Sequence, residues 1–191
     1  MKLIFTISAP SGTGKSTLCK AVLKEIPELT FSVSCTTRSI RENETNGKDY
    51  LFIKHSEFQA KVKAGEFAEY EDVHGQYYGT LKSSLDKTII KGNPLLLELD
   101  VKGAMSIKAL YPDQTLSIFV KPPNEGELRK RLEGRGTDNM ELIQKRLTRI
   151  HMELEYEKMF DTSFINDNLE SAIKELKHII FNELKGKIHE Y

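Results

Sequence analysis

Cysteine is scarce in this sequence, and the two that occur exclude several classes of protein. Cys19 and Cys35 are the only cysteines among 191 residues, they form no CxxC pair, and the five histidines do not cluster. Neither a disulfide framework nor a zinc site is therefore expected. Buried or partly buried reduced thiols in a cytoplasmic protein are the favoured interpretation.

An excess of charge of either sign is also missing. Lys and Arg number 28, Asp and Glu number 28, and the net charge is zero. This balance argues against a strongly basic nucleic-acid-binding protein and against a polybasic membrane surface. No apolar stretch approaches the roughly 18 residues of a membrane-spanning helix, and a strand expected from residue 3 leaves no room for a signal peptide. We therefore expect small-molecule partners, with no nucleic acid and no membrane, and the oligomeric state stays open.

A glycine-rich segment, residues 9–17, lies between an expected strand and an expected helix. Residues 3–8 form a short apolar run rich in β-formers, and Leu18, Val22 and Ile26 recur on one side of the following helix. The first N–H groups of a helix are unpaired and its dipole adds positive charge, so this arrangement forms a cradle for phosphate. The expected phosphate-binding residues are Ala9, Pro10, Ser11, Gly12, Thr13, Gly14, Lys15, Ser16 and Thr17.

Lys15 and Ser16 carry the chemistry of this segment. It follows the G-x-x-x-x-G-K-[ST] pattern, in which the lysine contacts the β- and γ-phosphates and the hydroxyl ligates Mg²⁺. Ala9 replaces the first glycine, and Pro10 favours an extended conformation there, in which alanine costs little. The segment predicts a nucleoside-triphosphate site. A chance glycine-rich turn before a helix is the alternative.

Strands alternate with helices along the rest of the chain. Strands are expected at residues 31–36, 50–53, 94–100, 116–120 and 163–166, and further short strands with a turn within 66–80. Helices are expected at residues 15–26, from a capping box at Ser56 to Gly65, at 81–91, at 102–110, as two charged helices within 124–158, and at 169–186. The pattern predicts a three-layer α/β/α fold with a parallel sheet, whose ligands lie at the carboxyl ends of the strands, and a small mixed α/β insertion at residues 35–80.

Two carboxylates close an apolar strand, two residues apart. Glu98 and Asp100 are therefore expected to share one face of that strand. A strand that ends in aspartate beside a phosphate loop is typical of a Mg²⁺ site. We expect Ser16 to ligate Mg²⁺ directly and Asp100 to contact it through water; ordinary solvation of a strand end is the alternative.

Five arginines are candidates for charge neutralisation. Arg38 and Arg41 lie in the polar loop of residues 37–48, and Arg131, Arg135 and Arg146 lie in the two-helix insertion, whose helices are joined by residues 134–138. Charged surface helices are usually solvated faces, but Arg135 lies between two glycines, a position that suits a mobile tip. Phosphoryl transfer requires several guanidinium groups that close around the phosphates.

Six stretches together resemble the guanylate kinase family over essentially the whole chain. They are residues 9–17, 31–38, 65–69, 75–80, 99–103 and 134–138. The phosphate loop alone would fit many kinases, whereas the combination is specific. The resemblance implies a P-loop nucleoside monophosphate kinase of purine nucleotide metabolism that uses Mg²⁺ to transfer the ATP γ-phosphoryl group to GMP. It also implies a core of residues 1–34, 81–123 and 153–191, a GMP-binding lobe of residues 35–80 and a lid of residues 124–152.

The matching positions imply roles for individual residues. Those implied to hold the GMP phosphate are Arg38, Arg41, Tyr50 and Tyr78. Those implied to bind or flank the base are Ser34, Glu69, Thr80, Glu98 and Asp100. Asn166 and Asp167 match a stretch near the adenosine of ATP. The implied catalytic set is Lys15, Arg38, Asp100, Arg131, Arg135 and Arg146.

Hydrogen-bonding chemistry supports the role of Glu69 independently. The edge of guanine presents two donors, N1–H and the 2-amino group, beside the O6 acceptor. An ionised carboxylate accepts from both donors, whereas adenine would present a bare N1 to it. The hydroxyls of Ser34 and Thr80 can donate to O6. A surface carboxylate without function is the alternative for Glu69.

Three departures from the family pattern and two other functions stay open. Glu98 stands where aspartate is expected, Lys102 where glutamine is usual and Gln76 where asparagine is usual. The contact of Glu98, to a Mg²⁺-bound water or to the base, is left open. A kinase for AMP, UMP or dTMP is one rival, and a non-catalytic guanylate-kinase-like module that binds peptides is another. The intact phosphate loop argues against the second, and the sequence does not decide whether dGMP is accepted.

Overall fold

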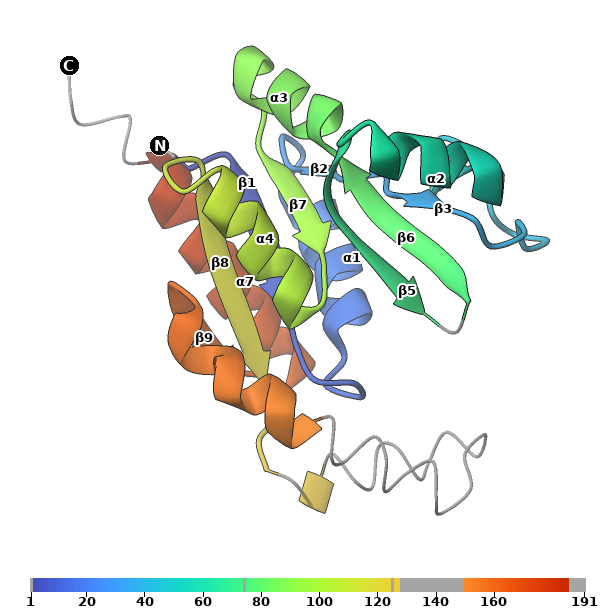
Figure 1. Cartoon of the computed structure of the whole chain (residues 1–191). Helices are drawn as coiled ribbons and strands as arrows, with labels where there is room; N and C mark the ends of the chain where they lie inside the picture. The colour runs from blue at the N-terminus through green and yellow to red at the C-terminus, as the bar shows by residue number, and fades with distance from the viewer. Residues whose placement is uncertain (1, 74, 125, 128–149, 186–191) are drawn as a thin grey trace.

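The computed structural model describes residues 2–73, 75–124, 126–127 and 150–185. Figure 1 shows a central sheet between helices and a second, smaller sheet beside it. Neither the connecting segment of residues 128–149 nor the last six residues are among those described.

The central sheet has five parallel strands in the order β2-β7-β1-β8-β9. Their bounds are Ile4–Ser8 for β1, Thr30–Phe31 for β2, Leu95–Glu98 for β7, Thr115–Lys121 for β8 and Thr162–Ile165 for β9. β1 lies in the middle and all five of its residues are buried. Because all neighbours are parallel, the carboxyl ends of β1 and β7 meet at one edge of the sheet, where ligands bind in such folds.

Helices cover both faces of this sheet, as the alternation of strands and helices predicted. α1 (Lys15–Glu25) and α7 (Leu169–Lys185) pack over one face, where Phe5 and Ile7 of β1 contribute to the core. α3 (Lys82–Lys91) and α4 (Val101–Leu110) pack over the other face, with Ile4 of β1 in that core. The three-layer α/β/α arrangement is thereby confirmed, and α4 is seen in front of the sheet in Figure 1.

The second sheet has four strands in the order β4-β3-β6-β5. Their bounds are Cys35–Thr36 for β3, Leu51–Phe52 for β4, Phe67–Val73 for β5 and Gln76–Leu81 for β6, and α2 (His55–Lys63) packs on them. β5 and β6 form an antiparallel hairpin, so the strands and turn expected within residues 66–80 are confirmed. Phe58 of α2 stacks on Phe67 with ring centroids 4.4 Å apart in a small separate core. The assignment of residues 35–80 to a functional lobe stays a prediction.

The single strand expected over residues 31–36 is wrong. The segment contributes β2 to the central sheet and β3 to the second sheet, and it crosses between them at residues 32–34. The backbone N–H of Ser32 donates to Leu96 O at 2.9 Å, while Ser34 O accepts from the N–H of Leu51 at 2.9 Å. Phe31 is 39% exposed, and its strand β2 lies at the edge of the central sheet.

Two helix starts also differ from the sequence prediction. α2 begins at His55 with Lys54 as its N-cap and no side-chain cap, so the capping box at Ser56 is wrong. α4 begins at Val101, because the Asp100 side chain caps it and ends the preceding strand pattern at Glu98. The end of α3 at Gly92 is confirmed, where the backbone is left-handed with φ of 68°.

The two charged helices expected within residues 124–158 lie largely outside the described residues. Residues 150–155 are helical and lead into the 3₁₀ helix η1 (Tyr156–Met159). Both cysteines are buried and free, which agrees with the prediction of reduced thiols. None of the helices in the described part of the chain has the length and apolar character that crossing a bilayer requires.

Phe58→Ala is expected to destabilise the protein by about 3–5 kcal/mol, because the ring is fully buried and its loss leaves a cavity beside Phe67. Urea unfolding followed by circular dichroism measures the change. Ile90→Ala removes a side chain that is 84% exposed and should change the free energy of unfolding by less than about 0.5 kcal/mol. Equal effects of the two substitutions would contradict a separate packed core under α2.

Candidate active site

The phosphate loop connects β1 to α1 and has the backbone conformation that its glycines allow. Gly12 and Gly14 have φ of 89° and 90°, in the left-handed region, and Gly14 is the N-cap of α1. The first turn of α1 contains no acidic side chain. The positive end of the helix dipole is therefore left for an external anion. Ala9, the departure from the motif, packs its methyl group against the core under α1.

Side chains of the loop are tied to the end of β7. Lys15 Nζ donates to Leu99 O at 2.6 Å, and Ser8 Oγ lies 3.1 Å from Leu99 O and 3.0 Å from Asp100 O. Leu99 and Asp100 follow β7 directly, and β7 is the parallel neighbour of β1. The lysine ammonium is thus held at the carboxyl edge of the sheet, above the turn that carries it.

Asn166 braces the same loop from the other side. Its Nδ2 donates to Thr13 O at 2.7 Å, and the side chain is 5% exposed. A Cβ added to Gly14 would approach the same Nδ2 atom to 3.1 Å. Asn166 therefore lies beside the phosphate loop, while its predicted proximity to adenosine stays a prediction, as does that of the exposed Asp167.

The oxygen atoms of Ser16 and Glu98 near the loop fit the ligand preference of a magnesium ion. Ser16 Oγ donates to Glu98 Oε1 at 2.5 Å, which places a hydroxyl and a carboxylate side by side at the start of α1. Mg²⁺ prefers oxygen ligands and usually binds through one or two protein groups, waters and substrate phosphates. Among the described residues, no group of three or more His, Cys, Asp or Glu side chains is arranged to hold a metal alone. A site of this kind would therefore depend on the triphosphate for its remaining ligands.

The prediction that Glu98 and Asp100 share one face of a strand is wrong. β7 ends at Glu98, and Asp100 is the N-cap of α4, where its Oδ1 accepts from the N–H of Gly103 at 2.7 Å. A carboxylate at an N-cap satisfies an otherwise unpaired N–H of the first turn. The two side chains therefore point to different partners: Glu98 reaches the phosphate loop, and Asp100 reaches the first turn of α4.

Glu69, the predicted base-binding carboxylate, lies close to Asp100. An added Cβ on Gly103 would be 3.1 Å from Asp100 Oδ1 and 3.2 Å from Glu69 Oε2, so both carboxyl groups crowd the same helix start. The pKa of Glu69 is raised to about 7: burial is the main cause and the charge of Asp100 adds to it, while the hydroxyl and backbone of Thr80, opposite in the hairpin, act in the other direction. Such a perturbed carboxyl at a sheet edge is typical of a functional site.

The residues predicted to hold the GMP phosphate form a second group. The guanidinium carbon of Arg38 lies 5.5 Å from the ring centroid of Tyr50, and the rings of Tyr50 and Tyr78 meet edge to face at 5.8 Å. Arg41 is exposed in the same loop. The structure therefore brings Arg38, Tyr50 and Tyr78 together, and they present one cation and two hydroxyls.

The carboxyl group of Glu69 and the group of Arg38, Tyr50 and Tyr78 both lie near the segment of residues 98–100. Burial raises the pKa of Tyr50, and the charge of Glu98 contributes to the rise. Glu98 therefore lies within electrostatic range of the Arg38 group while it contacts Ser16 of the phosphate loop. The charge of Asp100 acts on Glu69 in the same way. One short segment thus connects the triphosphate cradle with both parts of the expected acceptor site.

Some predicted site residues are not tested by these contacts. Ser34 is partly buried between the two sheets, and its side-chain role stays a prediction. Arg131, Arg135 and Arg146 lie outside the described residues.

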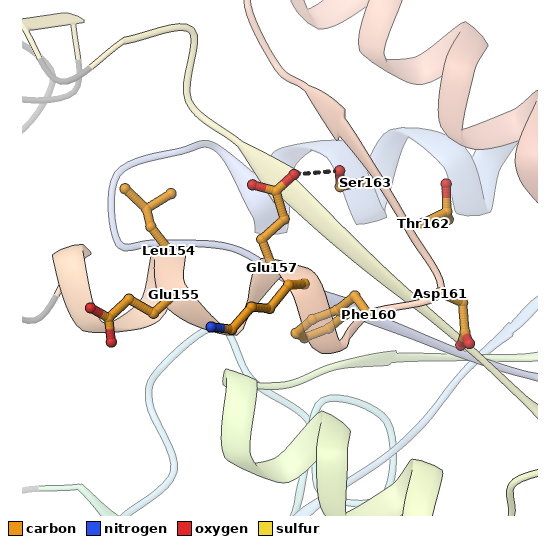
Figure 2. Close-up of a pocket in the computed structure, with 8 residues that line it drawn as sticks. Leu154, Glu155, Glu157, Phe160, Asp161, Thr162 and Ser163 are labelled. Carbon is orange, nitrogen blue, oxygen red and sulfur yellow. Dashed lines mark hydrogen bonds between the residues drawn. The ribbon is translucent and has the colours of Figure 1, made fainter.

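A cavity of about 560 Å³ lies apart from the site residues, along η1 and the start of β9. Figure 2 shows its lining, where Glu157 accepts a hydrogen bond from Ser163 at 2.7 Å. Asp161 accepts from Ser117 and pairs with Lys108, so these carboxylates already have partners. None of the predicted site residues lines it, and we assign the cavity no ligand.

A family model described as guanylate kinase matches residues 1–183 of the chain. The chain belongs to the guanylate kinase family. It is an enzyme of the nucleoside monophosphate kinase type, and its fold is that of the P-loop kinases. This confirms the resemblance that the six sequence stretches carried.

Individual relatives agree with the family assignment. A guanylate kinase of Fusobacterium nucleatum is 45% identical over 182 residues, which are 95% of this chain and 97% of the relative. One of Salinibacter ruber is 44% identical over 173 residues, 90% of this chain and 92% of the relative. The crystal structure of guanylate kinase from Anaplasma phagocytophilum superimposes with a TM-score of 0.76 at 30% identity, covering 95% of this chain and 86% of that one.

Sequence reasoning missed three residues of the site. Glu44 forms an ion pair with Arg38, and the ring centroid of Phe52 lies 5.6 Å from the guanidinium carbon of Arg38. Gly103 leaves room for the carboxylates of Glu69 and Asp100. Glu44 is one of several charged residues in a polar loop, so composition does not single it out. The Gly103 signal was available, since a glycine in the first turn of an expected helix usually has a packing reason.

Glu69→Gln is expected to stabilise the ligand-free protein above pH 7 and to change little below pH 4.5. The folded-state pKa of about 7 lies above the ordinary value of 4.5, so stability is lost as the pH rises between these values, when the buried carboxyl must ionise. A shift of this size corresponds to up to about 3 kcal/mol, or several degrees in Tm. Thermal unfolding of both proteins from pH 4.5 to pH 8 measures the change. A difference in Tm that does not vary with pH would contradict it.

Proposed function

We propose that this chain transfers the γ-phosphoryl group of ATP to GMP, giving ADP and GDP, with the residues identified above in defined roles. The observation that carries the proposal is the position of residues 98–100 between the phosphate loop and the Glu69 carboxyl. That position would bring the end of a triphosphate close to an acceptor whose base lies against Glu69. Family membership supports the same reaction.

The ATP phosphates would lie in the loop of residues 9–17. Backbone N–H groups at the start of α1 would donate to phosphate oxygens, and Lys15 would leave or share the Leu99 carbonyl to contact the β- and γ-phosphates. Ser16 would ligate Mg²⁺, with Asp100 and Glu98 acting through water. When bound, the ion neutralises charge on the phosphates. Arg131, Arg135 and Arg146 are proposed to approach them from the lid of residues 124–152.

The GMP phosphate would lie against Arg38, Tyr50 and Tyr78, with Arg41 joining from the same loop. A guanidinium and two hydroxyls together match the donors that a phosphate dianion requires. Residues 35–80 would then be the GMP-binding lobe, and residues 1–34, 81–123 and 153–191 the ATP-binding core. Motion of the lobe toward the core would align donor and acceptor.

The guanine base would lie against Glu69, Thr80 and Ser34. Ionised Glu69 accepts from N1–H and the 2-amino group, and the hydroxyls donate to O6. A base without those donors would leave a buried carboxylate unpaired, and a site of this type discriminates by several orders of magnitude. This argument favours GMP over AMP, which presents a bare N1, and over UMP and dTMP, whose bases offer the carboxylate one N–H donor in place of two.

No side chain need act as a general base in this reaction. The attacking oxygen of the GMP phosphate is already anionic near neutral pH. Catalysis then consists of aligning two anions that repel each other, with Lys15 and the arginines neutralising their charge. Closure of the lid would exclude water and prevent ATP hydrolysis. A cytoplasmic location is part of the proposal, because free buried cysteines are usual in reducing compartments.

Lys15→Ala is expected to lower kcat by at least about 100-fold with the fold intact, because it removes the ammonium group that is held beside the phosphate loop. ADP release in a coupled assay measures the rate, over a panel of GMP, dGMP, AMP, UMP and dTMP. Lys20→Ala, an exposed lysine on the same helix, is the control. A normal rate for Lys15→Ala would refute the loop assignment, and a preference for another monophosphate would refute the acceptor assignment.

Glu69→Gln is expected to lower kcat/KM for GMP by about 10- to 100-fold, because an amide replaces one acceptor with a donor opposite the guanine donors. KM for ATP should not change, since Glu69 belongs to the acceptor side. Steady-state kinetics with each substrate varied in turn measure both. The control is Glu57→Gln, which changes an exposed carboxyl on α2. Equal kcat/KM for GMP in Glu69→Gln and in the parent enzyme would overturn the base-binding role.

A further inference from the structure

A carboxylate that has no role in the proposals above, Glu44, lies among the side chains assigned to the GMP phosphate. Its Oε2 accepts from Nη1 of Arg38 at 2.9 Å and its Oε1 accepts from Nη2 at 2.7 Å. The pair is only 15% and 18% exposed, and the hydrogen bonds from Arg38 hold the pKa of Glu44 at about 2. An ionised carboxylate therefore lies within the group of residues proposed to bind a phosphate, although its charge would repel that phosphate.

Three N–H groups of the Arg38 side chain donate to residues of its own loop, and the other two lie on a different edge of the guanidinium. A guanidinium has five N–H groups. Glu44 accepts one from each of Nη1 and Nη2, and Ser39 O accepts the second N–H of Nη1 at 2.8 Å. Nε–H and the second N–H of Nη2 donate neither to Glu44 nor to Ser39, and these two lie on one edge of the planar group; the hydroxyl of Tyr78, itself assigned to the phosphate, is a further hydrogen-bond partner of the guanidinium. That edge has the geometry for two parallel hydrogen bonds to phosphate oxygens.

Glu44 also closes the loop that carries the two arginines. Its Oε2 accepts from the backbone N–H of Arg41 at 2.9 Å, and its own N–H donates to Arg41 O at 3.0 Å. The backbone at Arg41 is therefore fixed by the same carboxylate that holds the Arg38 side chain. A single side chain thus holds the guanidinium of Arg38 and the backbone of Arg41.

Aromatic rings support the orientation that Glu44 imposes. Tyr50 and Phe52 lie 5.5 Å and 5.6 Å from the guanidinium carbon of Arg38, and the Phe52 N–H is bonded to Asn46 Oδ1 at 2.9 Å. An arginine side chain free in solvent must lose substantial rotamer entropy when it binds a ligand. Here most of that entropy is lost on folding, so binding of the phosphate costs less.

We propose that Glu44 is a positioning residue for the monophosphate: it occupies the end of the Arg38 guanidinium and turns the Nε–Nη2 edge toward the phosphate. The inference rests on the assignment of the GMP site above. It predicts that Glu44 acts on the affinity for GMP through its phosphate, and neither on ATP nor on the guanine base.

The test is Glu44→Gln in the full chain, with Glu44→Asp as the conservative variant. Glutamine keeps the size but offers one acceptor and a donor that opposes the second guanidinium N–H. KM for GMP is expected to rise about tenfold, with kcat within about threefold of the parent and KM for ATP unchanged. Glu44→Asp should recover part of the loss, because it keeps the charge. Glu42→Gln, an exposed carboxyl of the same loop, is the matched control and should change none of these.

Inhibition by guanosine separates positioning of the phosphate from a general disturbance of the site. Guanosine keeps the base but lacks the phosphate, so its inhibition constant should be the same in Glu44→Gln and in the parent enzyme. Equal weakening of guanosine and GMP would overturn the proposal, because it would show that the whole acceptor site is altered. An unchanged KM for GMP would overturn it too.

A lower KM for GMP in Glu44→Gln would also overturn the proposal, since it would mean that the carboxylate competes with the phosphate for Arg38. Failure of the reaction itself is visible separately. If the parent enzyme did not phosphorylate GMP, the proposed function would be wrong before any variant was compared.

Discussion

The hydrogen bonds that join the phosphate loop to the end of β7 are the interaction on which the rest of the site depends. Lys15 and Ser8 both bind carbonyl oxygens of the 99–100 segment, and Ser16 binds the Glu98 carboxylate. Since β1 and β7 are parallel neighbours, their ends are held at a fixed separation by the sheet. Asp100 of the same segment lies beside Glu69, so in the proposed function one edge of the sheet would position both substrates.

Charge balance is the second constraint on this edge. The site must accept two polyanions, yet Glu44, Glu69, Glu98 and Asp100 place four carboxylates around it. Each carboxylate acts on a specific donor: Arg38, Ser16 and the start of α4 in the ligand-free protein, and the guanine edge for Glu69 in the proposed complex. Ionised Glu69 lowers the stability of the folded protein, because burial raises its pKa and opposes ionisation in the folded state. Such local costs are expected where function requires a polar group in a buried position.

Much of the fold followed from local patterns, and the errors have a common cause. The buried run of β1, the end of α3 at Gly92 and the hairpin of β5 and β6 depend on residues close in sequence, and each was found where expected. The segment of residues 31–36 was assigned to one strand because alternation does not reveal which sheet a strand joins. The start of α4 was misplaced for a related reason: an aspartate at position 100 is compatible both with the end of a strand and with a helix N-cap.

The sequence by itself determined the family, the phosphate loop and the alternation of strands and helices that builds a parallel sheet. Each of these is encoded by residue types at short, fixed spacings. The family resemblance pointed to Glu69 as the base-binding carboxylate, and this role stays a prediction that the chemistry of the guanine edge supports. Only the tertiary structure decided that Glu44 holds Arg38, that Asn166 braces Thr13 from 153 residues away, and that Glu98 and Asp100 point to different partners. These contacts depend on how β7, α4 and the second sheet are placed in space, and hydrophobic spacing along the chain carries no information about which polar side chains then meet.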